Sequence, residues 1–412
     1  MLVLQTAGKP ETSRGRIGLA VAGGGPIGAM YELGALRALE VAIEGFDATR
    51  ADAYVGVSSG SFLAAALANG LDTAELVRIV IRGDSHEARF RPQIFLQPAF
   101  VEYLRRASSL PSVAWGWWRD LLTDASGSRL GELAARLGSL IPTGMFDNAR
   151  IEAFLRDVLT RHGRSNDFRT LPRRLYVVAV DLDSGEAVRF GGPGWDDVPI
   201  SMAVQASAAL PGLYPPVTIR GRQFVDGALR RTMHASVVLD HGIDLLLGIN
   251  PLVPFNATRA ADAPSRRGDG AEPRSARLSD AGLPVVLSQT FRTLLQSRVQ
   301  VGFAKYAQQY PATDQMVFEP DEDDGEMFFT NVFSYASRER VCEMAFRNTL
   351  RDLSQRRRVL APMLDRHGLR LREGLDDPAR SVMDGIGPAP RRTDATARLA
   401  RALDELESRL GG

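Results

Sequence analysis

The chain has 412 residues, of which 44% are hydrophobic and 24% charged, a composition typical of globular proteins that bury a large core. Its 50 Lys and Arg residues balance 49 Asp and Glu residues to a net charge of +1, so the overall charge does not indicate a nucleic-acid partner. The single cysteine, Cys342, excludes an internal disulfide and a cysteine-rich zinc site.

The N-terminus lacks the pattern of a signal peptide. Residues 1–16 begin with a short apolar segment, but no basic region leads into an apolar core. No uninterrupted apolar run approaches the ~18 residues of a membrane span. We therefore expect a cytoplasmic protein. Peripheral attachment to a membrane, and export by a route that reads no cleavable signal, are left open.

The first predicted unit is a strand, a glycine loop and a helix. Residues 16–22 are apolar and predict a buried strand, which runs into Gly23-Gly-Gly-Pro-Ile-Gly28. Leucines at helical spacing predict a helix over residues 29–40, and residues 53–57 predict the next buried strand. This succession predicts a βαβ opening, typical of an α/β protein.

A second glycine pattern, Gly56-Val-Ser-Ser-Gly60, joins that strand to a predicted small-residue helix over residues 59–69. It matches the G-x-S-x-G elbow, in which a sharp turn exposes a serine hydroxyl above the sheet edge. We expect Ser58 to be that serine, with Gly56 and Gly60 beside it because a Cβ at either position would clash. The amides at the start of the helix would then face negative charge forming on a substrate.

The glycine loop has a competing interpretation. Its spacing also fits the dinucleotide fingerprint, in which loop amides hold a pyrophosphate and an acid about 20 residues later binds ribose. Glu40, Glu44 and Asp47 are candidates for that acid, although none of them ends a clear strand. This interpretation predicts an oxidoreductase with a nicotinamide or flavin cofactor.

In the hydrolase interpretation, the same loop forms an oxyanion hole for Ser58. Pro26 has no N–H, so Gly24 and Gly25 are the favoured donors. Because a serine elbow lies on the very next strand, the sequence favours this interpretation. The whole predicted oxyanion-hole loop comprises Gly23, Gly24, Gly25 and Gly28.

Downstream, the strand predicted at residues 223–225 ends at Asp226-Gly227-Ala228, where an acid meets a tight turn. His234 and His241 follow it and complete the chain order Ser, Asp, His of an ordinary α/β-hydrolase triad. Both come so soon after Asp226 that their spacing is poor for that fold. Other predicted strands cover residues 174–182, 187–190 and 244–250, and other predicted helices cover residues 146–159, 200–209, 285–306 and 337–367.

Three motifs in this order, Gly23–Gly28, Gly56–Gly60 and Asp226–Ala228, resemble those of patatin-like phospholipases, the bacterial acyl-hydrolase branch. The stretch Ala206-Ser-Ala-Ala-Leu-Pro-Gly212, followed by Pro215-Pro-Val217, supports this resemblance, which covers about residues 16–251. It implies a three-layer α/β/α sandwich with a mostly parallel central sheet, a helical insertion and a helical C-terminal region.

The resemblance also implies a serine acyl hydrolase of the lipid esterase or phospholipase A type, working through an acyl-serine intermediate. Its Ser-Asp dyad would be Ser58 and Asp226, with Gly227 and Ala228 completing the aspartate motif and no cofactor or metal. Ile27 stands where family loops often carry a basic residue, which leaves neutral esters and thioesters open as substrates. A catalytically silent interaction protein on the same fold is also left open.

The domain organisation follows from composition and from the extent of the resemblance. Residues 113–118 hold three of the four tryptophans, and the aromatic segment around them fits a cap over an acyl pocket, a membrane contact or plain aromatic packing. The partners implied are a lipid or acyl-ester substrate, with no nucleic acid. We expect a tail (1–15), a patatin-like catalytic domain (16–252) with a helical cap or insertion (84–145), a flexible linker (253–283), a helical region (284–372) and a tail with a terminal helix (373–412).

Overall fold

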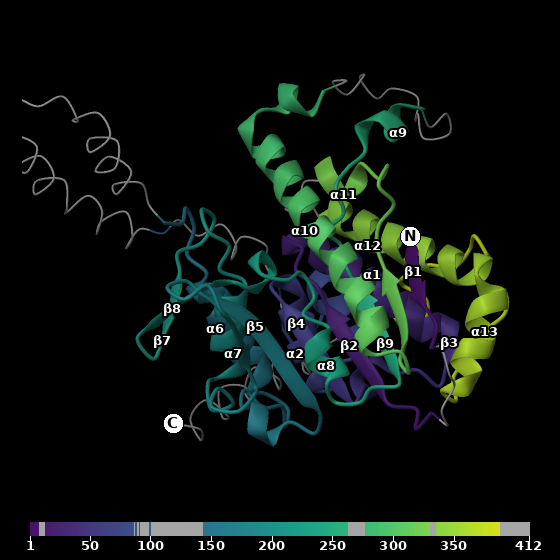
Figure 1. Ribbon diagram of the computed structural model, residues 1–412, viewed down its shortest axis with the longest axis horizontal. Helices are drawn as coiled ribbons and strands as arrows, with labels where there is room; N and C mark the ends of the chain where they lie inside the picture. Colours follow the sequence, from purple (N-terminus) through teal and green to yellow (C-terminus); the bar gives the residue numbers. More distant parts are fainter. Residues whose placement is uncertain are drawn as a thin grey trace, which may run out of the picture.

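The computed structural model describes residues 1–7, 13–85, 87–88, 90, 99, 143–262, 277–329 and 335–387. A large mixed sheet lies at its centre, between helices (Figure 1). The strands are β1 (Leu2–Gln5), β2 (Ile17–Val21), β3 (Ile43–Glu44), β4 (Ala53–Val57), β5 (Arg174–Asp181), β6 (Ala187–Phe190), β7 (Val217–Ile219), β8 (Arg222–Asp226), β9 (Leu245–Ile249), β10 (Asp314–Phe318) and β11 (Arg370–Leu371).

The α-helices are α1 (Gly25–Ala42), α2 (Ser59–Ala68), α3 (Thr73–Val77), α6 (Ala149–Leu159), α7 (Ile200–Ser207), α8 (Ser236–Leu239), α9 (Ala257–Asp262), α10 (Leu283–Gln309), α11 (Glu326–Phe329), α12 (Tyr335–Gln355) and α13 (Arg357–Arg366). Shorter helical turns are η1 (Ala48–Arg50), η2 (Arg78–Arg82), η4 (Phe168–Thr170), η5 (Gly227–Leu229) and η6 (Leu278–Ala281). Within these described parts of the chain, none of the helices is both long and apolar enough to cross a bilayer.

The main sheet has the order β1-β10-β9-β2-β4-β5-β8-β7, with β6 also paired to β5. β10, β9, β2, β4 and β5 run parallel to one another, whereas β1, β6, β7 and β8 pair antiparallel with their neighbours. Because parallel strands end at the same edge, the loops after β2, β4 and β9 meet at one side of the sheet. Both glycine motifs lie in such loops.

Helices cover both faces of the sheet, and the strand side chains alternate between them. Tyr54 of β4 belongs to the core cluster that includes α1, α2 and α12. Val55 and Val57 belong to the opposite cluster, which includes α8 and Tyr306 of α10. The three-layer α/β/α fold with a mostly parallel sheet, predicted from the sequence, is therefore confirmed.

Strands β1 and β10 of the main sheet were not predicted from the sequence. β1 lies in the stretch predicted to be an N-terminal tail, yet it pairs antiparallel with β10 at the sheet edge. β10 lies in the region predicted to be helical and continues the parallel sheet beside β9. These strands are short, and β10 buries two polar side chains, Asp314 and Gln315, which break the apolar run that would have predicted a strand.

Two predicted irregular segments are more ordered than expected. α9 occupies part of the predicted linker, and Val382 is fully buried within the predicted C-terminal tail. The Glu343 carboxylate accepts hydrogen bonds from the Ser381 hydroxyl and the Val382 amide, both at 2.9 Å, which attaches this segment to α12. Most of the predicted insertion at 84–145, its tryptophan cluster, residues 263–276 of the linker and the terminal helix lie outside the described residues.

Candidate active site

Ser58 occupies the sharp turn between β4 and α2 with φ 50° and ψ −123°. A positive φ is rare for a residue with a Cβ and marks the strained backbone typical of a nucleophile elbow. The turn is held from both sides. The Ser58 amide donates to the Ser207 hydroxyl at 2.9 Å, and the Ser61 hydroxyl donates to the Ser58 carbonyl at 2.5 Å.

The glycines on either side of Ser58 allow strand and helix to approach closely. A Cβ built on Gly56 would lie 2.4 Å from the Cα of Ser61, and one built on Gly60 would lie 2.4 Å from the carbonyl oxygen of Val21. Neither space can hold a methyl group. Gly56 and Gly60 therefore occupy the places that the elbow pattern predicted, for the steric reason that it predicted.

Strand β5 lies between the two halves of the site. Val57 pairs with Val178 on one side of β5, and Asp226 pairs with Ala179 on the other. The turn after Asp226 passes close over β5, because a Cβ on Gly227 would lie only 2.1 Å from the carbonyl oxygen of Val178. That close passage brings the aspartate motif to the elbow, although Ser58 and Asp226 are far apart in the sequence.

The environment of Asp226 changes its affinity for a proton. Burial raises the pKa of its carboxyl group from 3.8 to about 6, because the charged form is desolvated. A side-chain hydrogen bond with Ser58 and a hydrogen bond from the Ala228 amide, at 2.8 Å, limit that rise. Asp226 is therefore ionised at neutral pH and still a stronger base than an exposed aspartate.

The glycine loop completes the site from a third direction. A Cβ on Gly23 would lie 2.9 Å from the Cβ of Ser58 and 3.2 Å from the Cβ of Ala228, so the three motifs meet at Gly23. The Gly23 amide donates to the carbonyl of Thr232 at 3.3 Å, and the Gly28 amide donates to that of Gly24 at 3.0 Å. Of the four predicted loop glycines, these two use their amides within the fold.

The amides of Gly24 and Gly25 have no hydrogen-bond acceptor among the described residues. Both stand at the start of α1, where the first amides lack an intrahelical partner. The amide of Ser59 at the start of α2 is likewise without an acceptor within the described part of the chain. Donors for an oxyanion are thus available at Gly24 and Gly25, and also at Ser59, which the sequence analysis did not single out.

Each histidine of the alternative triad has a hydrogen-bond partner other than Ser58 and Asp226. His234 is buried, its Nε2 lies 3.4 Å from the carbonyl oxygen of Gly227, and desolvation lowers its pKa from 6.5 to about 4. His241 stacks on Tyr176 and bonds its hydroxyl at 2.7 Å, while Arg174 bonds the other ring nitrogen at 2.9 Å. Arg174 pairs with Ala53, at the end of β4 opposite to Ser58, so His241 lies at the other edge of the sheet.

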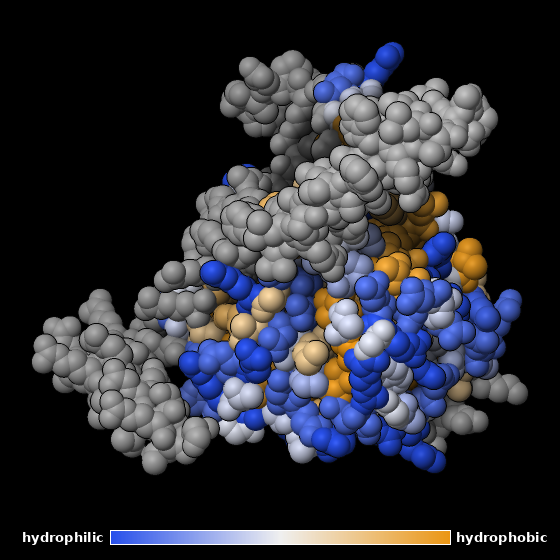
Figure 2. Space-filling view, turned by 90° about the vertical axis from the view of Figure 1, so that its left-hand side faces the viewer, coloured by the Kyte–Doolittle hydropathy of each residue, from blue (hydrophilic) through white to orange (hydrophobic). Residues whose placement is uncertain are grey.

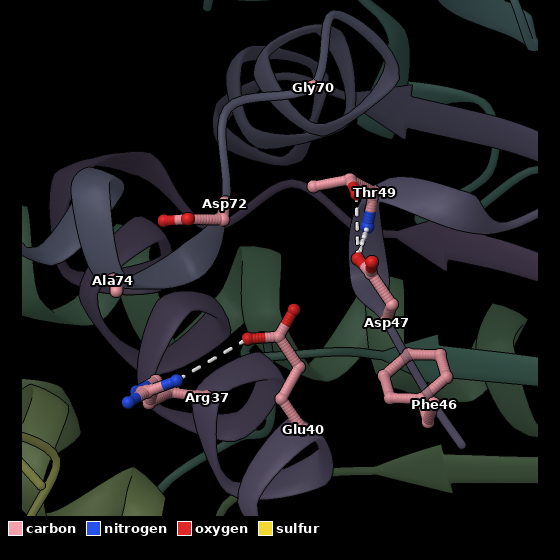
Figure 3. Close-up of a pocket in the computed structure, with 8 residues that line it drawn as sticks. All are labelled: Arg37, Glu40, Phe46, Asp47, Thr49, Gly70, Asp72 and Ala74. Carbon is pink, nitrogen blue, oxygen red and sulfur yellow. Dashed lines mark hydrogen bonds and ion pairs between the residues drawn. The ribbon is translucent and has the colours of Figure 1, made fainter. Parts of the chain in front are cut away.

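The acids of the dinucleotide interpretation also lie away from the glycine loop. Glu40 is near the C-terminal end of α1, about 22 Å of helix from Gly25. It pairs with Arg37 at 3.6 Å, while Asp47 accepts hydrogen bonds from Thr49 at 2.8 and 2.6 Å (Figure 3). These residues line a cavity of about 430 Å³ at the far end of α1 from Ser58. Glu44, the third candidate, ends the two-residue strand β3 that directly follows the C-terminal end of α1.

Glu32 is a buried acid next to the elbow that the sequence analysis missed. Its Oε1 accepts a hydrogen bond from the Ser59 hydroxyl at 3.0 Å, which connects α1 to the first residue of α2. Burial raises the pKa of its carboxyl group well above 4.5, and the bond from Ser59 offsets only part of that rise. Burial therefore favours the protonated form of Glu32, whose hydrogen bond with Ser59 helps to position the elbow.

Replacing Glu32 by glutamine is expected to make the protein less sensitive to alkaline pH. A carboxyl group whose pKa is higher in the folded state contributes less stability as the pH rises above its unfolded value, by up to about 1.4 kcal/mol per pH unit. Thermal unfolding of both proteins between pH 5 and 9 measures this effect. The melting temperature of Glu32→Gln should fall less with pH than that of the wild type; parallel curves would contradict a raised pKa of Glu32.

Ser207 is a further residue whose role only the structure reveals. Its hydroxyl accepts from the Ser58 amide and donates to the Val178 carbonyl at 2.6 Å.

Ser207→Ala is expected to destabilise the protein by about 1–3 kcal/mol, since it leaves a buried amide unpaired. It should also lower kcat, because Ser58 loses the contact that fixes its turn. Ser201→Ala, another buried serine of α7, is the control and should leave kcat much less affected.

A family model described as patatin-like phospholipase matches residues 19–239, which include all three motifs. VipD from Legionella pneumophila is 17% identical, with 63% of this chain and 55% of that chain covered and a TM-score of 0.32. Human GIVD cytosolic phospholipase A2, in complex with methyl gamma-linolenyl fluorophosphonate, is 14% identical, with 86% and 59% covered and a TM-score of 0.33. This chain thus spans less than two thirds of either structure.

Proposed function

The chain belongs to the patatin-like phospholipase family, and on that basis we propose that it is a serine acyl hydrolase acting on lipid esters. Family membership supports lipid hydrolysis as the class of activity. The observation that carries the finer proposal is the meeting of Ser58, Asp226 and the Gly23–Gly25 loop around one point, although they come from three distant stretches of the chain. A nucleophile, a base and a set of oxyanion donors are the parts that ester hydrolysis by a serine requires.

In the proposed acylation step, the Ser58 hydroxyl attacks the ester carbonyl carbon while the Asp226 carboxylate takes the hydroxyl proton. The carbonyl oxygen becomes an oxyanion, which the amides of Gly24 and Gly25 stabilise at the start of α1. The tetrahedral intermediate then expels the alcohol, which leaves with the proton from Asp226. An acyl ester on Ser58 remains.

In the proposed deacylation step, a water molecule attacks the acyl-serine carbonyl and gives its proton to Asp226. The second tetrahedral intermediate collapses, Ser58 recovers its proton from Asp226, and the fatty acid leaves. A base whose pKa is about 6 suits both steps, because it is ionised at neutral pH and yet binds a proton better than an ordinary aspartate does. No histidine is required in this scheme.

The substrate is proposed as a lipid ester, with the head group undefined. Ile27 stands in the glycine loop, half-buried against the core, where a basic residue would attract a phosphate group. Neutral lipid esters are therefore proposed alongside phospholipids, and thioesters share the same carbonyl chemistry. The positions of Glu40 and Asp47, at the opposite end of α1 from the loop, disfavour an oxidoreductase that binds a dinucleotide there.

Labelling with an active-site fluorophosphonate, combined with hydrolysis of p-nitrophenyl esters of graded chain length, tests the proposal. Wild-type protein is expected to gain one label, on the peptide that contains Ser58, and to prefer esters long enough to fill an acyl pocket. A comparison of phosphatidylcholine with triacylglycerol then separates phospholipid from neutral-lipid hydrolysis. A folded protein that takes up no label and hydrolyses none of these esters would instead favour the silent interaction protein.

A further inference from the structure

Helix α10 is apolar on two opposite faces. One face is buried and carries Leu295, Val299 and Tyr306, which pack toward the sheet. On the other face, Leu287, Phe291 and Leu294 are 46%, 48% and 56% exposed, at a spacing that places them on one side of the helix. We call this outward face the α10 stripe; its members are Leu283, Val286, Leu287, Phe291 and Leu294. A stripe of large apolar side chains open to water marks an interaction surface.

The stripe lies at the active-site edge of the sheet. Arg298 donates to the carbonyl of Leu229 at 2.7 Å, in the turn that follows Asp226. Six residues earlier in α10, Arg292 donates a hydrogen bond to the carbonyl of Val253 at 3.2 Å. Val253 belongs to the loop after β9, in which Pro251 packs against Gly24 and Gly28. The middle of α10 is thus packed against two loops that surround the glycine loop and the aspartate motif.

From that contact the helix continues outward. α10 runs antiparallel to the parallel strands, because β10 follows it and starts level with the start of β9. The segment from Arg292 back to Leu283 therefore extends past the strand ends, by about 14 Å of helix. Figure 1 shows α10 crossing the sheet and continuing beyond it, and Figure 2 shows apolar side chains gathered at the upper right of the turned view.

The charged residues within α10 are all basic, and the nearest acid before it in the chain is the exposed Asp280, three residues before Leu283. α10 contains no Asp or Glu in its 27 residues, and its charged residues are Arg292, Arg298 and Lys305. Arg230 and Arg231, in the turn after Asp226, are exposed beside Arg298. None of Arg230, Arg231 and Arg298 forms an ion pair within the described residues. Large apolar side chains with cations at their base fit an anionic lipid surface better than a protein partner.

We propose that the α10 stripe docks the protein onto an anionic phospholipid bilayer. The apolar side chains enter the boundary between head groups and acyl chains, while Arg230, Arg231 and Arg298 lie against lipid phosphates. Docking of this kind places the elbow edge of the sheet at the lipid surface, where an acyl ester can leave the bilayer for Ser58. The inference rests on the proposed lipid substrate for its purpose, although the docking itself requires no turnover.

Vesicle co-sedimentation of the full chain tests the proposal, in a Ser58→Ala background so that the lipid stays intact. The protein is expected to bind vesicles of phosphatidylcholine mixed with phosphatidylglycerol, less strongly at high salt, and to bind pure phosphatidylcholine weakly. The triple variant Leu287→Ser, Phe291→Ser, Leu294→Ser should bind the anionic vesicles about tenfold or more weakly, because it removes most of the apolar surface. Val359→Ser, at another exposed apolar position, should bind as the parent does.

A second measurement locates the contact directly. Because the single native cysteine is buried, an environment-sensitive dye can be placed at Leu287→Cys or, as the control, at Val359→Cys. The dye at 287 is expected to shift to the blue when anionic vesicles are added, and the dye at 359 should not shift. Circular dichroism checks that each variant is folded.

Equal vesicle binding by the parent and the triple variant, or no binding by the parent, would overturn the proposal. A dye at 287 that shifts without vesicles, in a protein that light scattering shows to be a dimer, would assign the stripe to a second copy of the chain instead. Vesicle binding by a protein that hydrolyses no ester would count against the proposed activity and leave the docking surface standing. Ester hydrolysis by a protein that binds no vesicles would support the proposed activity and overturn the docking surface.

Discussion

Ser58→Ala is expected to lower kcat/KM for ester hydrolysis by about 10⁴-fold or more, because no other group can form the acyl intermediate. The same substitution should abolish fluorophosphonate labelling. Both readouts are measured on p-nitrophenyl esters and by intact-protein mass spectrometry. Because Ser58 adopts a positive φ, which alanine tolerates no better than serine does, thermal unfolding accompanies the assay to show that the fold is retained.

The chain provides a matched control in the neighbouring serine. Ser59 stands in the same elbow, but its hydroxyl faces Glu32 rather than the site. Ser59→Ala is therefore expected to keep the label and to lose far less turnover than Ser58→Ala, since it removes only the positioning bond to Glu32 and leaves the backbone amide unchanged. Full hydrolysis by Ser58→Ala would refute the nucleophile assignment, and labelling of Ser58→Ala would place the reactive serine elsewhere.

The second large effect is expected at Asp226. Asp226→Asn should lower kcat/KM by about 10³-fold, because an amide cannot accept the proton of Ser58 while its shape still fits the turn. Its Oδ1 can continue to accept from the Ala228 amide, so the motif should stay in place. Substantial turnover by this variant would contradict the dyad, and would reopen the question of a base such as His234.

The raised pKa of Asp226 adds a dependence on pH that the variant lacks. Ionised Asp226 is the active form, so kcat/KM of the wild type is expected to rise with pH, with a midpoint near its pKa of about 6. The rate of fluorophosphonate labelling should follow the same curve. A midpoint near 4 would show instead that the carboxylate is solvated and is not the buried base described above.

The stability of the variant separates a loss of chemistry from a loss of fold. The folded-state pKa of Asp226 lies above the ordinary value of 3.8, so its contribution to the free energy of unfolding decreases as the pH rises from 3.8 to about 6. At neutral pH the buried carboxylate therefore opposes folding. Asp226→Asn should be at least as stable as the wild type at pH 7, as is common where an active-site group is held in an unfavourable environment.

Several parts of this protein were predictable from the sequence because they depend on near neighbours. β2, β4, β5 and β9 are apolar runs bounded by turn residues, and each lies within a residue or so of its predicted range. The elbow was equally predictable, since the glycines flanking Ser58 are required by contacts only a few residues away or on the adjacent strand. The family resemblance rests on these same local motifs.

Other parts depend on pairing between distant segments, which local periodicity does not encode. β1 and β10 are short and partly polar, and they become strands only because they pair with each other and, for β10, with β9. In the same way, Ser207 and Glu32 are an ordinary serine and an ordinary glutamate until α7 and α1 pack against the elbow. Nothing in their own surroundings along the chain distinguishes them.

The sequence by itself therefore determined the parts of the site: a glycine loop, a serine elbow and an aspartate turn, each made by residues close together in the chain. Only the tertiary structure decided how these parts are related. Strand β5 separates Val57 from Asp226, and the close passage of Gly227 over Val178 joins the two halves. Burial then raised the affinity of Asp226 for a proton. Packing also buried one face of α10 and left the apolar side chains of the other face exposed at the active-site edge of the sheet. Desolvation and exposure are properties of the folded whole, so no local pattern could reveal them.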